Sequence, residues 1–578
     1  MNIKRLLKLS LCLLPLTVSP VVFALDNSAL TRYDYENDIF HPIHATHGMV
    51  ASEQVLATQV GLDILKRGGN AIDAAVGVGF ALAVVLPNAG NIGGGGFMVL
   101  HDAKTGKDFT LDFREMAPQK ASRNMYLDEK GNVIPDQSLY THNAVGVPGT
   151  VAGMEYALKK WGSLPLSEVI KPSIDLAQKG IRVSPALAKL LDVEQQNLAK
   201  WDSTKAIFFK NNTPLKEGDL LVQKDLAKSL KLIAKHGSQV FYNGEIGQKI
   251  VAEMQHHGGI MSAEDLKNYK AIERPPIVGD YRGYKIVTMP PPSSGGVHIV
   301  QILNMLEHYP ISSYGVNSAQ SIHYMAEAMK LAYADRSEYL GDPDFTHVPV
   351  SGLTSKKYAD ELVKIISPDT ARASSTIKPN NPMPYESDQT THYSTVDQYG
   401  NAVAVTYTLN FNFGSGIVAT GTGILLNDEM DDFSSKPGVP NGFGLIGGEA
   451  NAIGAKKRPL SSMSPTLVLK DNKPWLVTGS PGGSRIISAV LQTIVNSIDF
   501  KMNPAEAAST PRIHHQWLPD ELRIEKGISA DTVNILKKQG YDVKQKAVMG
   551  RTQTIQVLPD GFYGYSDPRN PDGATRGY

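Results

Sequence analysis

The apolar residues near the start of the chain follow two helical patterns. In residues 51–66 they recur with the period of an amphipathic helix, which Gly68 and Gly69 end. Residues 71–86 are apolar on nearly every side, which predicts a fully buried helix that is too short to cross a membrane. Four glycines at 93–96 and the apolar residues 97–100 then predict a tight turn followed by a strand. No Lys-Ser or Lys-Thr pair follows the glycines, so they do not match a phosphate-binding loop.

The middle of the chain is helical in pattern and is followed by a polar run. Residues 163–334 predict a scaffold of amphipathic helices, with a proline- and glycine-rich loop at 290–296. Residues 367–389 contain four prolines and little to bury, which predicts a mobile segment. Strand patterns follow at 392–396, 402–410, 466–469 and 475–477, and a helix is expected near 486–498. Together these patterns predict a layered α/β body, in which the polar run interrupts the sequence more than the fold.

A β-hairpin directly after the polar run is the sharpest local pattern. Residues 398–400 form a three-residue loop with glycine last, which pairs Asp397 with Asn401 and fixes the register of both strands. That register places Thr408 opposite Thr390. Because strand side chains alternate, the second strand has an apolar face and a polar face, and the polar one carries Thr406, Thr408 and Asn410. Threonines are common in strands, so the hairpin alone identifies no site.

Composition and the N-terminal residues favour small-molecule chemistry in an exported protein. The 578 residues include 57 basic and 57 acidic side chains, a balance that argues against a nucleic-acid partner. Residues 1–24 combine basic residues with a short apolar run that two prolines interrupt, which predicts a cleaved secretory signal rather than a stable membrane anchor. The single cysteine, Cys12, lies in that signal, so the mature chain is expected to lack disulfides and thiol nucleophiles. We expect a periplasmic protein, with full secretion as the alternative.

Several specific blocks of sequence follow one another in a recognisable order. Thr390-Thr391-His392-Tyr393-Ser394 is followed by blocks at 425–433, 457–466 and 479–485, and it is preceded by the glycine run and by the block at 112–115. Together they resemble the gamma-glutamyltransferases, the gamma-glutamyltranspeptidase family, over essentially the whole mature chain. The sequence is identified as a member of that family.

The resemblance implies a fold and a route of activation. The fold is that of the N-terminal-nucleophile hydrolases, an α/β (α+β) four-layer αββα sandwich formed jointly by a large and a small subunit. The precursor is expected to cleave itself between Gln389 and Thr390, which gives a heterodimer of residues 25–389 and 390–578. Cleavage frees an α-amino group with an unperturbed pKa of about 7.7–8.0, which suits a general base for the Thr390 hydroxyl. Thr408 is expected to orient that hydroxyl.

The resemblance also implies how a gamma-glutamyl donor such as glutathione or glutamine is bound. Arg114 is expected to bind the α-carboxylate of the donor, together with the hydroxyls of Ser461 and Ser462. The expected acceptors for the α-ammonium group are Asn410, Glu429 and Asp432. The backbone N–H groups of Gly482 and Gly483 are expected to stabilise the oxyanion, and they count among the catalytic and the substrate-binding groups. The acyl group then passes from the threonine to water, an amino acid or a dipeptide.

One position departs from the family pattern. Phe443, in the lid segment 440–444, stands where several bacterial relatives carry a tyrosine whose hydroxyl reaches the asparagine corresponding to Asn410. We expect this lid to keep an apolar cover without the polar latch, so that water entry and acceptor choice differ.

No cofactor and no metal are expected. His41, His44 and His47 recur at three-residue spacing, but no motif such as His-Glu-x-x-His accompanies them, so they are interpreted as solvated. No Gly-x-Gly-x-x-Gly after a strand indicates a nucleotide site.

Two alternative functions stay open at this point. A cephalosporin (glutaryl) acylase of the same superfamily would use the same threonine chemistry, but its acyl group lacks the α-amine that Asn410, Glu429 and Asp432 would bind. A secreted non-catalytic binding protein would have no reason to keep Thr390 beside a cleavable segment.

Overall fold

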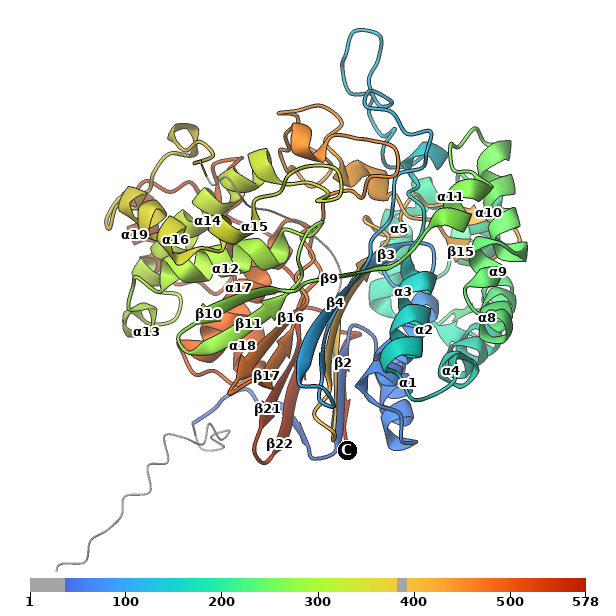
Figure 1. Ribbon diagram of the computed structural model, residues 1–578, viewed down its shortest axis with the longest axis horizontal. Coiled ribbons are helices and arrows are strands. Elements are labelled where there is room, and N and C mark those ends of the chain that lie inside the picture. Colours follow the sequence, from blue (N-terminus) through green and yellow to red (C-terminus); the bar gives the residue numbers. More distant parts are fainter. Residues whose placement is uncertain (1–36, 382–391) are drawn as a thin grey trace, which may run out of the picture.

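Two seven-stranded antiparallel sheets lie face to face in the middle of the molecule, and helices cover the outer face of each (Figure 1). The structure is a computed structural model that describes residues 37–381 and 392–578. The expected αββα sandwich is confirmed. The expected signal at 1–24, with Cys12, and the expected cleavage point at Gln389 and Thr390 lie outside the described residues.

Each sheet combines strands from before and after residues 382–391. In spatial order, the first sheet contains β1 (Ile43–Ala45), β22 (Gly561–Ser566), β21 (Gln553–Leu558), β17 (Lys473–Thr478), β16 (Thr466–Lys470), β11 (Tyr284–Thr288) and β10 (Ile277–Tyr281). The second contains β23 (Ala574–Gly577), β2 (Gly48–Ser52), β12 (His392–Asp397), β13 (Ala402–Thr408), β3 (Gly95–Asp102), β4 (Lys107–Phe113) and β9 (Ile272–Arg274). The polar run therefore interrupts the sequence and not the fold, as predicted.

Two groups of helices form the outer layers. The group beside the second sheet contains α1 (Val55–Lys66), α2 (Ala71–Val85), α3 (Thr150–Trp161), α4 (Leu166–Lys179), α5 (Pro185–Val193), α6 (Gln195–Leu198), α7 (Asp202–Phe208), α8 (Lys224–His236), α9 (Gln239–Tyr242), α10 (Glu245–His256) and α11 (Ala263–Asn268). The group beside the first sheet contains α12 (Gly295–Leu306), α13 (Ile311–Tyr314), α14 (Ala319–Tyr339), α15 (Val350–Leu353), α16 (Lys356–Leu362), α17 (Arg485–Ile498), α18 (Pro504–Ser509) and α19 (Ala530–Lys538).

Short elements complete the described chain. They are the strand pairs β5 (Ile181–Arg182) with β8 (Leu220–Leu221), β6 (Phe209–Lys210) with β7 (Thr213–Pro214) and β14 (Val418–Ala419) with β15 (Ile424–Leu425), the small sheet β18 (Ile513–His514), β19 (Leu522–Ile524) and β20 (Val543–Gln545), and the 3₁₀ turns η2 (His142–Ala144), η3 (Val363–Ile365), η4 (Ser374–Thr376), η5 (Glu429–Asp432) and η6 (Glu449–Asn451).

A separate apolar core fills each space between layers. All fifteen residues of α2 are buried, which agrees with a sequence that is apolar on nearly every side. The space between the two sheets is filled by small and medium side chains such as Ala51, Val99, Ala404 and Leu467. Burial on both faces explains why these strands carry long apolar runs and hold the centre of the molecule rigid.

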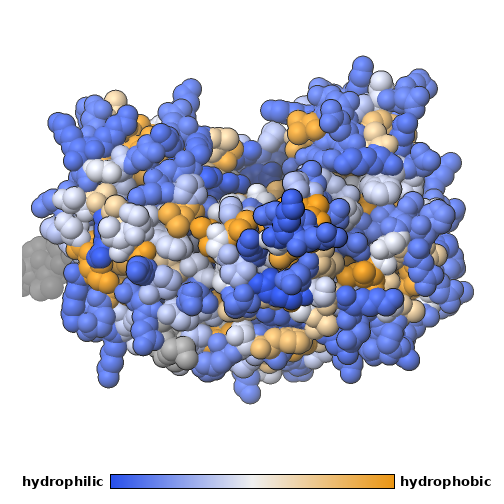
Figure 2. Space-filling model, turned by 90° about the horizontal axis from the view of Figure 1, so that it is seen from above, coloured by the Kyte–Doolittle hydropathy of each residue, from blue (hydrophilic) through white to orange (hydrophobic). Residues whose placement is uncertain are grey.

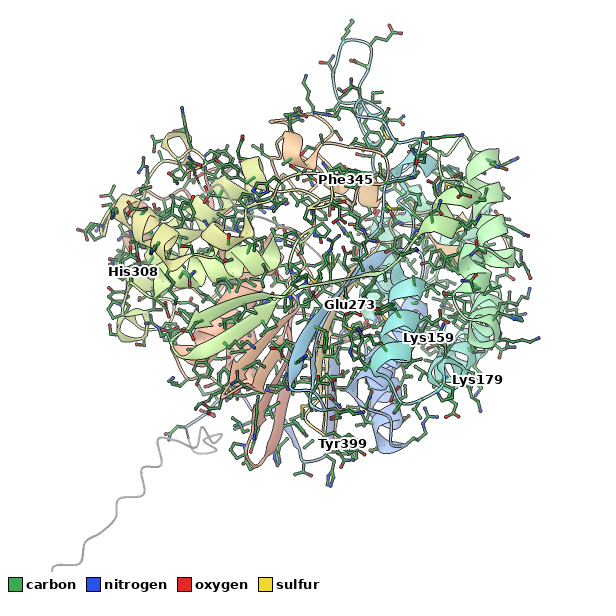
Figure 3. The ribbon with its side chains drawn as sticks, viewed as in Figure 1. Lys159, Lys179, Glu273, His308, Phe345 and Tyr399 are labelled. Carbon is green, nitrogen blue, oxygen red and sulfur yellow. The ribbon has the colours of Figure 1, made fainter. Side chains whose placement is uncertain are left out.

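The β12–β13 hairpin has the predicted register. His392 pairs with Thr406, and the amide of Asp397 donates a hydrogen bond to the carbonyl oxygen of Asn401 at 3.2 Å. Tyr399 marks the turn of the hairpin at the lower edge of the sheets (Figure 3). The strand end that follows Thr406 therefore lies at the opposite edge.

Both faces of this hairpin are buried. Val405 and Tyr407 pack against the helices, whereas Ala402 and Ala404 on the other face contact the first sheet. The Asp397 carboxylate accepts a hydrogen bond from the amide of Ala71 at 2.8 Å, so the hairpin also caps the start of α2. The predicted polar face of the second strand therefore lies inside the molecule.

The described part of the polar run, residues 367–381, differs from the expected segment with little to bury. Ser374 and Ile377 are buried, and the Ser374 hydroxyl donates to Asp520 at 2.7 Å. The carbonyl oxygen of Ser374 also accepts from the Trp517 indole at 3.0 Å. The expectation of little to bury was therefore wrong for Ser374 and Ile377, because they have internal partners that the sequence does not show, whereas mobility of the segment stays a prediction.

The face seen from above is mostly hydrophilic, with hydrophobic side chains in small scattered groups (Figure 2). Among the residues that the structure describes, no helix is both long enough and apolar enough to cross a membrane.

Candidate active site

A cavity of about 550 Å³ lies where the end of β13, the turn η5, the segment 440–444 and the start of α17 meet. Six of the ten predicted site residues line it: Thr408, Asn410, Glu429, Asp432, Gly482 and Gly483. These residues come from three separate stretches of sequence, which lie at the end of β13 of the second sheet, in the turn η5, and between β17 of the first sheet and α17. Thr390 lies outside the described residues.

The end of β13 is held in a fixed conformation. The hydroxyl oxygen of Thr408 accepts a hydrogen bond from the amide of Asn410 at 2.8 Å, and Asn410 has a left-handed backbone with φ of 83°. The Asn410 side-chain amide donates to the carbonyl oxygen of Asp428 at 3.0 Å. Asparagine tolerates this conformation better than most residues, so its side chain is directed by local geometry.

The glycine run at 93–96 supports Thr408 through close packing. A Cβ atom at Gly94 would lie 1.9 Å from the carbonyl oxygen of Thr408, so no larger residue fits there. Asn91 completes the support, since its side-chain amide donates to the same carbonyl at 2.8 Å and its oxygen accepts from the Gly94 amide at 3.0 Å. The predicted tight turn is therefore also a packing device. Sequence reasoning missed Asn91, which belongs to no quoted block.

Acidic side chains surround the fully buried guanidinium of Arg114. Its Nη1 donates to Glu429 Oε1 at 2.5 Å and its Nη2 to Asp432 Oδ2 at 2.5 Å, while Glu115 Oε2 lies 3.6 Å from Nη1. The Nε atom donates to the carbonyl oxygen of Pro459 at 3.1 Å. The positive charge of Arg336 also lowers the pKa of Asp432.

Burial dominates the ionisation of this cluster. It raises the pKa of Glu429 and of Asp432, while Arg114 opposes the shift in both. It raises the pKa of Glu115 to about 7 and that of Asp431 to about 6. Three buried carboxylates in contact with one guanidinium form a site with surplus acceptors, which favours the binding of another cation.

Arg114, Ser461 and Ser462 do not line the cavity. Both serines are fully buried. The backbone of Ser461 pairs with the loop at 290–296: its amide donates a hydrogen bond to the carbonyl oxygen of Pro292 at 2.9 Å, and its carbonyl oxygen accepts one from the amide of Ser294 at 3.0 Å. That loop, which the sequence pattern predicts to be part of the scaffold, thus positions the serine segment.

The Gly482-Gly483 segment immediately precedes α17. Gly483 has a left-handed backbone with φ of 60°, and a Cβ atom there would lie 2.7 Å from Phe443 Cδ1. Within the described part of the chain, neither glycine amide donates to an acceptor. Two N–H groups beside a helix N-terminus form a region of positive potential.

The lid segment 440–444 is closed over these glycines by an aromatic contact. Phe443 stacks on Phe411, with ring centroids 4.3 Å apart and an angle of 7° between the planes. The side chain of Asn441 accepts from the amides of Phe443 and Leu445, both at 3.1 Å, and this shapes the turn. The expectation of an apolar cover agrees with this stack, although the sequence did not identify Phe411 as its partner.

Three arginines on the cavity wall were also missed as site residues. They are Arg485, Arg523 and Arg551. Arg551 pairs with Glu53 at 3.3 Å and Arg523 with Glu521 at 2.6 Å, whereas Arg485 has no ion pair with a described carboxylate. Arg485 is the last residue of the family block at 479–485, so the sequence did offer a reason to include it among the site residues.

Comparisons with known proteins agree with this geometry. A family model described as gamma-glutamyltranspeptidase matches residues 57–577. The chain is 59% identical over 548 residues to the glutathione hydrolase proenzyme of Escherichia coli (strain K12), covering 94% of each chain, and 51% identical to that of Pseudomonas sp. (strain A14), covering 93% of this chain and 95% of the relative. The crystal structure of a cephalosporin acylase from Bacillus halodurans is similar with a TM-score of 0.85 at 30% identity, covering 95% of this chain and 98% of the other.

Proposed function

The chain belongs to the gamma-glutamyltranspeptidase family, and from that premise we propose that Thr390 is its nucleophile and that the cavity beside Thr408 is its active site. It is a glutathione hydrolase and gamma-glutamyltransferase that is made as a precursor and processes itself. The acylase alternative corresponds to a related member of the same family. The observation that carries the proposal is the convergence on one cavity of Thr408, the carboxylates of Glu429 and Asp432, and the backbone amides of Gly482 and Gly483, which donate to no acceptor within the described residues.

We propose that cleavage between Gln389 and Thr390 yields subunits of residues 25–389 and 390–578. A threonine hydroxyl needs a base, and the new α-amino group supplies one whose pKa lies near the working pH. The sequence register is proposed to set Thr390 opposite Thr408, and the observed pairing of His392 with Thr406 supports that proposal. The Thr408 hydroxyl accepts from the Asn410 amide, so its own proton is available to hydrogen-bond the Thr390 hydroxyl.

The donor is proposed to bind with its α-ammonium group among Asn410, Glu429 and Asp432. These side chains line the cavity, and the carboxylates outnumber the guanidinium that they contact. A glutaryl group carries no ammonium and would leave these acceptors buried and unpaired, which favours gamma-glutamyl donors such as glutathione and glutamine.

The α-carboxylate of the donor is proposed to bind Arg114, Ser461 and Ser462. The polar hydrogens of Arg114 are shared among Glu429, Asp432 and two carbonyl oxygens. Binding of the carboxylate there therefore requires at least one of these contacts to be exchanged, which couples recognition of the two charged groups of the donor.

The oxyanion of the tetrahedral intermediate is proposed to accept hydrogen bonds from the amides of Gly482 and Gly483. Two preorganised N–H groups in a partly enclosed site stabilise developing charge without reorganisation, and the N-terminus of α17 adds to this effect. Water, an amino acid or a dipeptide then takes the acyl group from Thr390. A signal at 1–24 and a periplasmic location complete the proposal.

Intact mass and gel analysis of wild-type and Thr390→Ala protein tests the central step, alongside release of a chromogenic amine from a gamma-glutamyl anilide. We expect wild type to split into two chains, one starting at Thr390, and to release the amine, while the variant stays whole and inactive. Wild type that remains whole and active would rule out the N-terminal threonine mechanism.

A further inference from the structure

Two histidines and a glutamate meet in the helical layer, outside the lining of the active-site cavity. His142 lies on η2, Glu253 on α10, and His257 directly after α10. Glu253 Oε1 is 3.1 Å from His142 Nε2 and 3.4 Å from His257 Nε2. The potential ligand atoms of the three residues all lie within 4.8 Å of one another.

We propose that these three side chains bind a divalent transition-metal ion of the zinc class. Zinc bound tetrahedrally by imidazole nitrogen and carboxylate oxygen at about 2.0–2.1 Å places neighbouring ligand atoms about 3.3 Å apart. The two distances to Glu253 Oε1 match that spacing. Two imidazoles with one carboxylate also suit zinc better than calcium or magnesium, which prefer all-oxygen sites.

The carboxylate is already oriented for this role. Glu253 Oε2 accepts hydrogen bonds from the amide of Thr420 at 3.1 Å and from its hydroxyl at 2.7 Å. The other oxygen, Oε1, is thereby directed at the two imidazoles. Partners of this kind, one shell behind the ligands, fix the geometry of metal sites.

The two rings have unequal freedom. His142 is buried, whereas the side chain of His257 is 37% exposed. The rings are stacked with centroids 4.5 Å apart, so His257 must turn to direct Nε2 at the ion, and its exposure provides the room. Trp201 packs edge-on against both rings, with its ring centroid 4.7 Å from that of His142 and 5.4 Å from that of His257.

The cluster is reachable from solvent. A hollow of about 620 Å³ is lined by Glu253 and His257 together with Trp201, Asp202 and Thr420. An ion can enter there, and water can occupy its fourth coordination position. His44 and His47, which the sequence pattern singled out, instead approach Asp560 and Tyr578.

The site spans the two proposed subunits. Its ligands precede residues 382–391, while Thr420, which holds Glu253, follows them. Binding only to the folded state stabilises that state, so the ion is expected to strengthen the contact between α10 and the segment around β14.

Titration calorimetry with zinc chloride on tag-free, chelator-treated mature protein tests the proposal. We expect one ion per heterodimer, and at least about tenfold weaker binding by His257→Ala. His308→Ala is the matched control, because that side chain is also 37% exposed, pairs with Asp360, and lies on the opposite side of the molecule from α10 (Figure 3). The control should bind zinc like wild type. Cobalt bound in place of zinc should show the strong visible absorption of a tetrahedral site in wild type and the control, and not in His257→Ala.

Absence of stoichiometric binding by wild type, or equal affinity of wild type and His257→Ala, would overturn the proposal. The uncleaved Thr390→Ala protein should bind zinc equally well, which separates this site from the proposed catalytic amine. The result is therefore independent of the proposed function.

Discussion

Glu115 is the most unusual single residue of the site. Its carboxylate is completely buried, neither oxygen has a hydrogen-bond partner within the described chain, and the nearest cation is Arg114 at 3.6 Å. Burial raises its pKa to about 7. Its charge therefore changes near neutral pH, at the edge of the group of carboxylates that is proposed to bind the donor.

Glu115→Gln is expected to change how stability depends on pH. The folded-state pKa of Glu115 lies above its unfolded value, so the folded protein binds the extra proton between about pH 4.5 and about pH 7. The resulting contribution of Glu115 to the free energy of unfolding is fully present below that pH range. It is lost as pH rises through the range, by up to about 3 kcal/mol. Between about pH 5 and about pH 8, the melting temperature of wild type should fall more than that of the variant, measured at one scan rate. Parallel curves for the two proteins would contradict this assignment.

At the scale of elements, the lid depends on one aromatic stack. The turn at 440–444 is shaped by Asn441, and its tip is attached through Phe443 to Phe411 and to the surface of Gly483. An apolar contact excludes water but does not fix the orientation of a polar group, so this stack covers the proposed oxyanion position without orienting a substrate there.

Removal of the stack should open the cavity to water. Phe443→Ala is expected to lose about 0.5–1.5 kcal/mol of aromatic contact beyond the loss of apolar burial, and to increase hydrolysis relative to transfer. Phe443→Tyr introduces the hydroxyl that the family pattern directs at the asparagine corresponding to Asn410, and it is expected to shift the ratio in favour of transfer. Both ratios can be measured as free glutamate against gamma-glutamyl dipeptide, with glycylglycine as acceptor. An unchanged ratio in Phe443→Tyr would count against a role for the missing latch.

At the scale of the whole molecule, the two proposed subunits share both sheets and the helical layer beside the first sheet. In the second sheet β12 lies between β2 and β13, and in the first sheet β16 lies between β17 and β11. Both sheets would lose central strands if the subunits separated, and the apolar cores between the layers would be exposed.

The cleaved chains should therefore remain together without a covalent link. After processing, we expect both to elute from gel filtration as one species, and to do so equally at high salt, because apolar burial is not screened by ions. Separation should require denaturant. Dissociation at high salt alone would show that charge pairs, rather than the shared sheets, hold the subunits together.

The sequence alone determined the elements with strong local signals. A buried helix followed from the all-apolar run at 71–86, and the register of the hairpin followed from the loop at 398–400. The two faces of the second strand followed from the alternation along 402–410. Each of these features depends only on neighbours in the chain. The family resemblance predicted six of the residues that line the cavity, although their catalytic and binding roles stay predictions.

Only the tertiary structure decided which distant groups meet. Asn91 reaches Thr408 across 317 positions, Phe411 stacks on the lid, and residues 367–381 find internal partners. The same holds for His142 and Glu253, which are 111 positions apart. Local spacing cannot encode such contacts, because the packing of whole layers creates them.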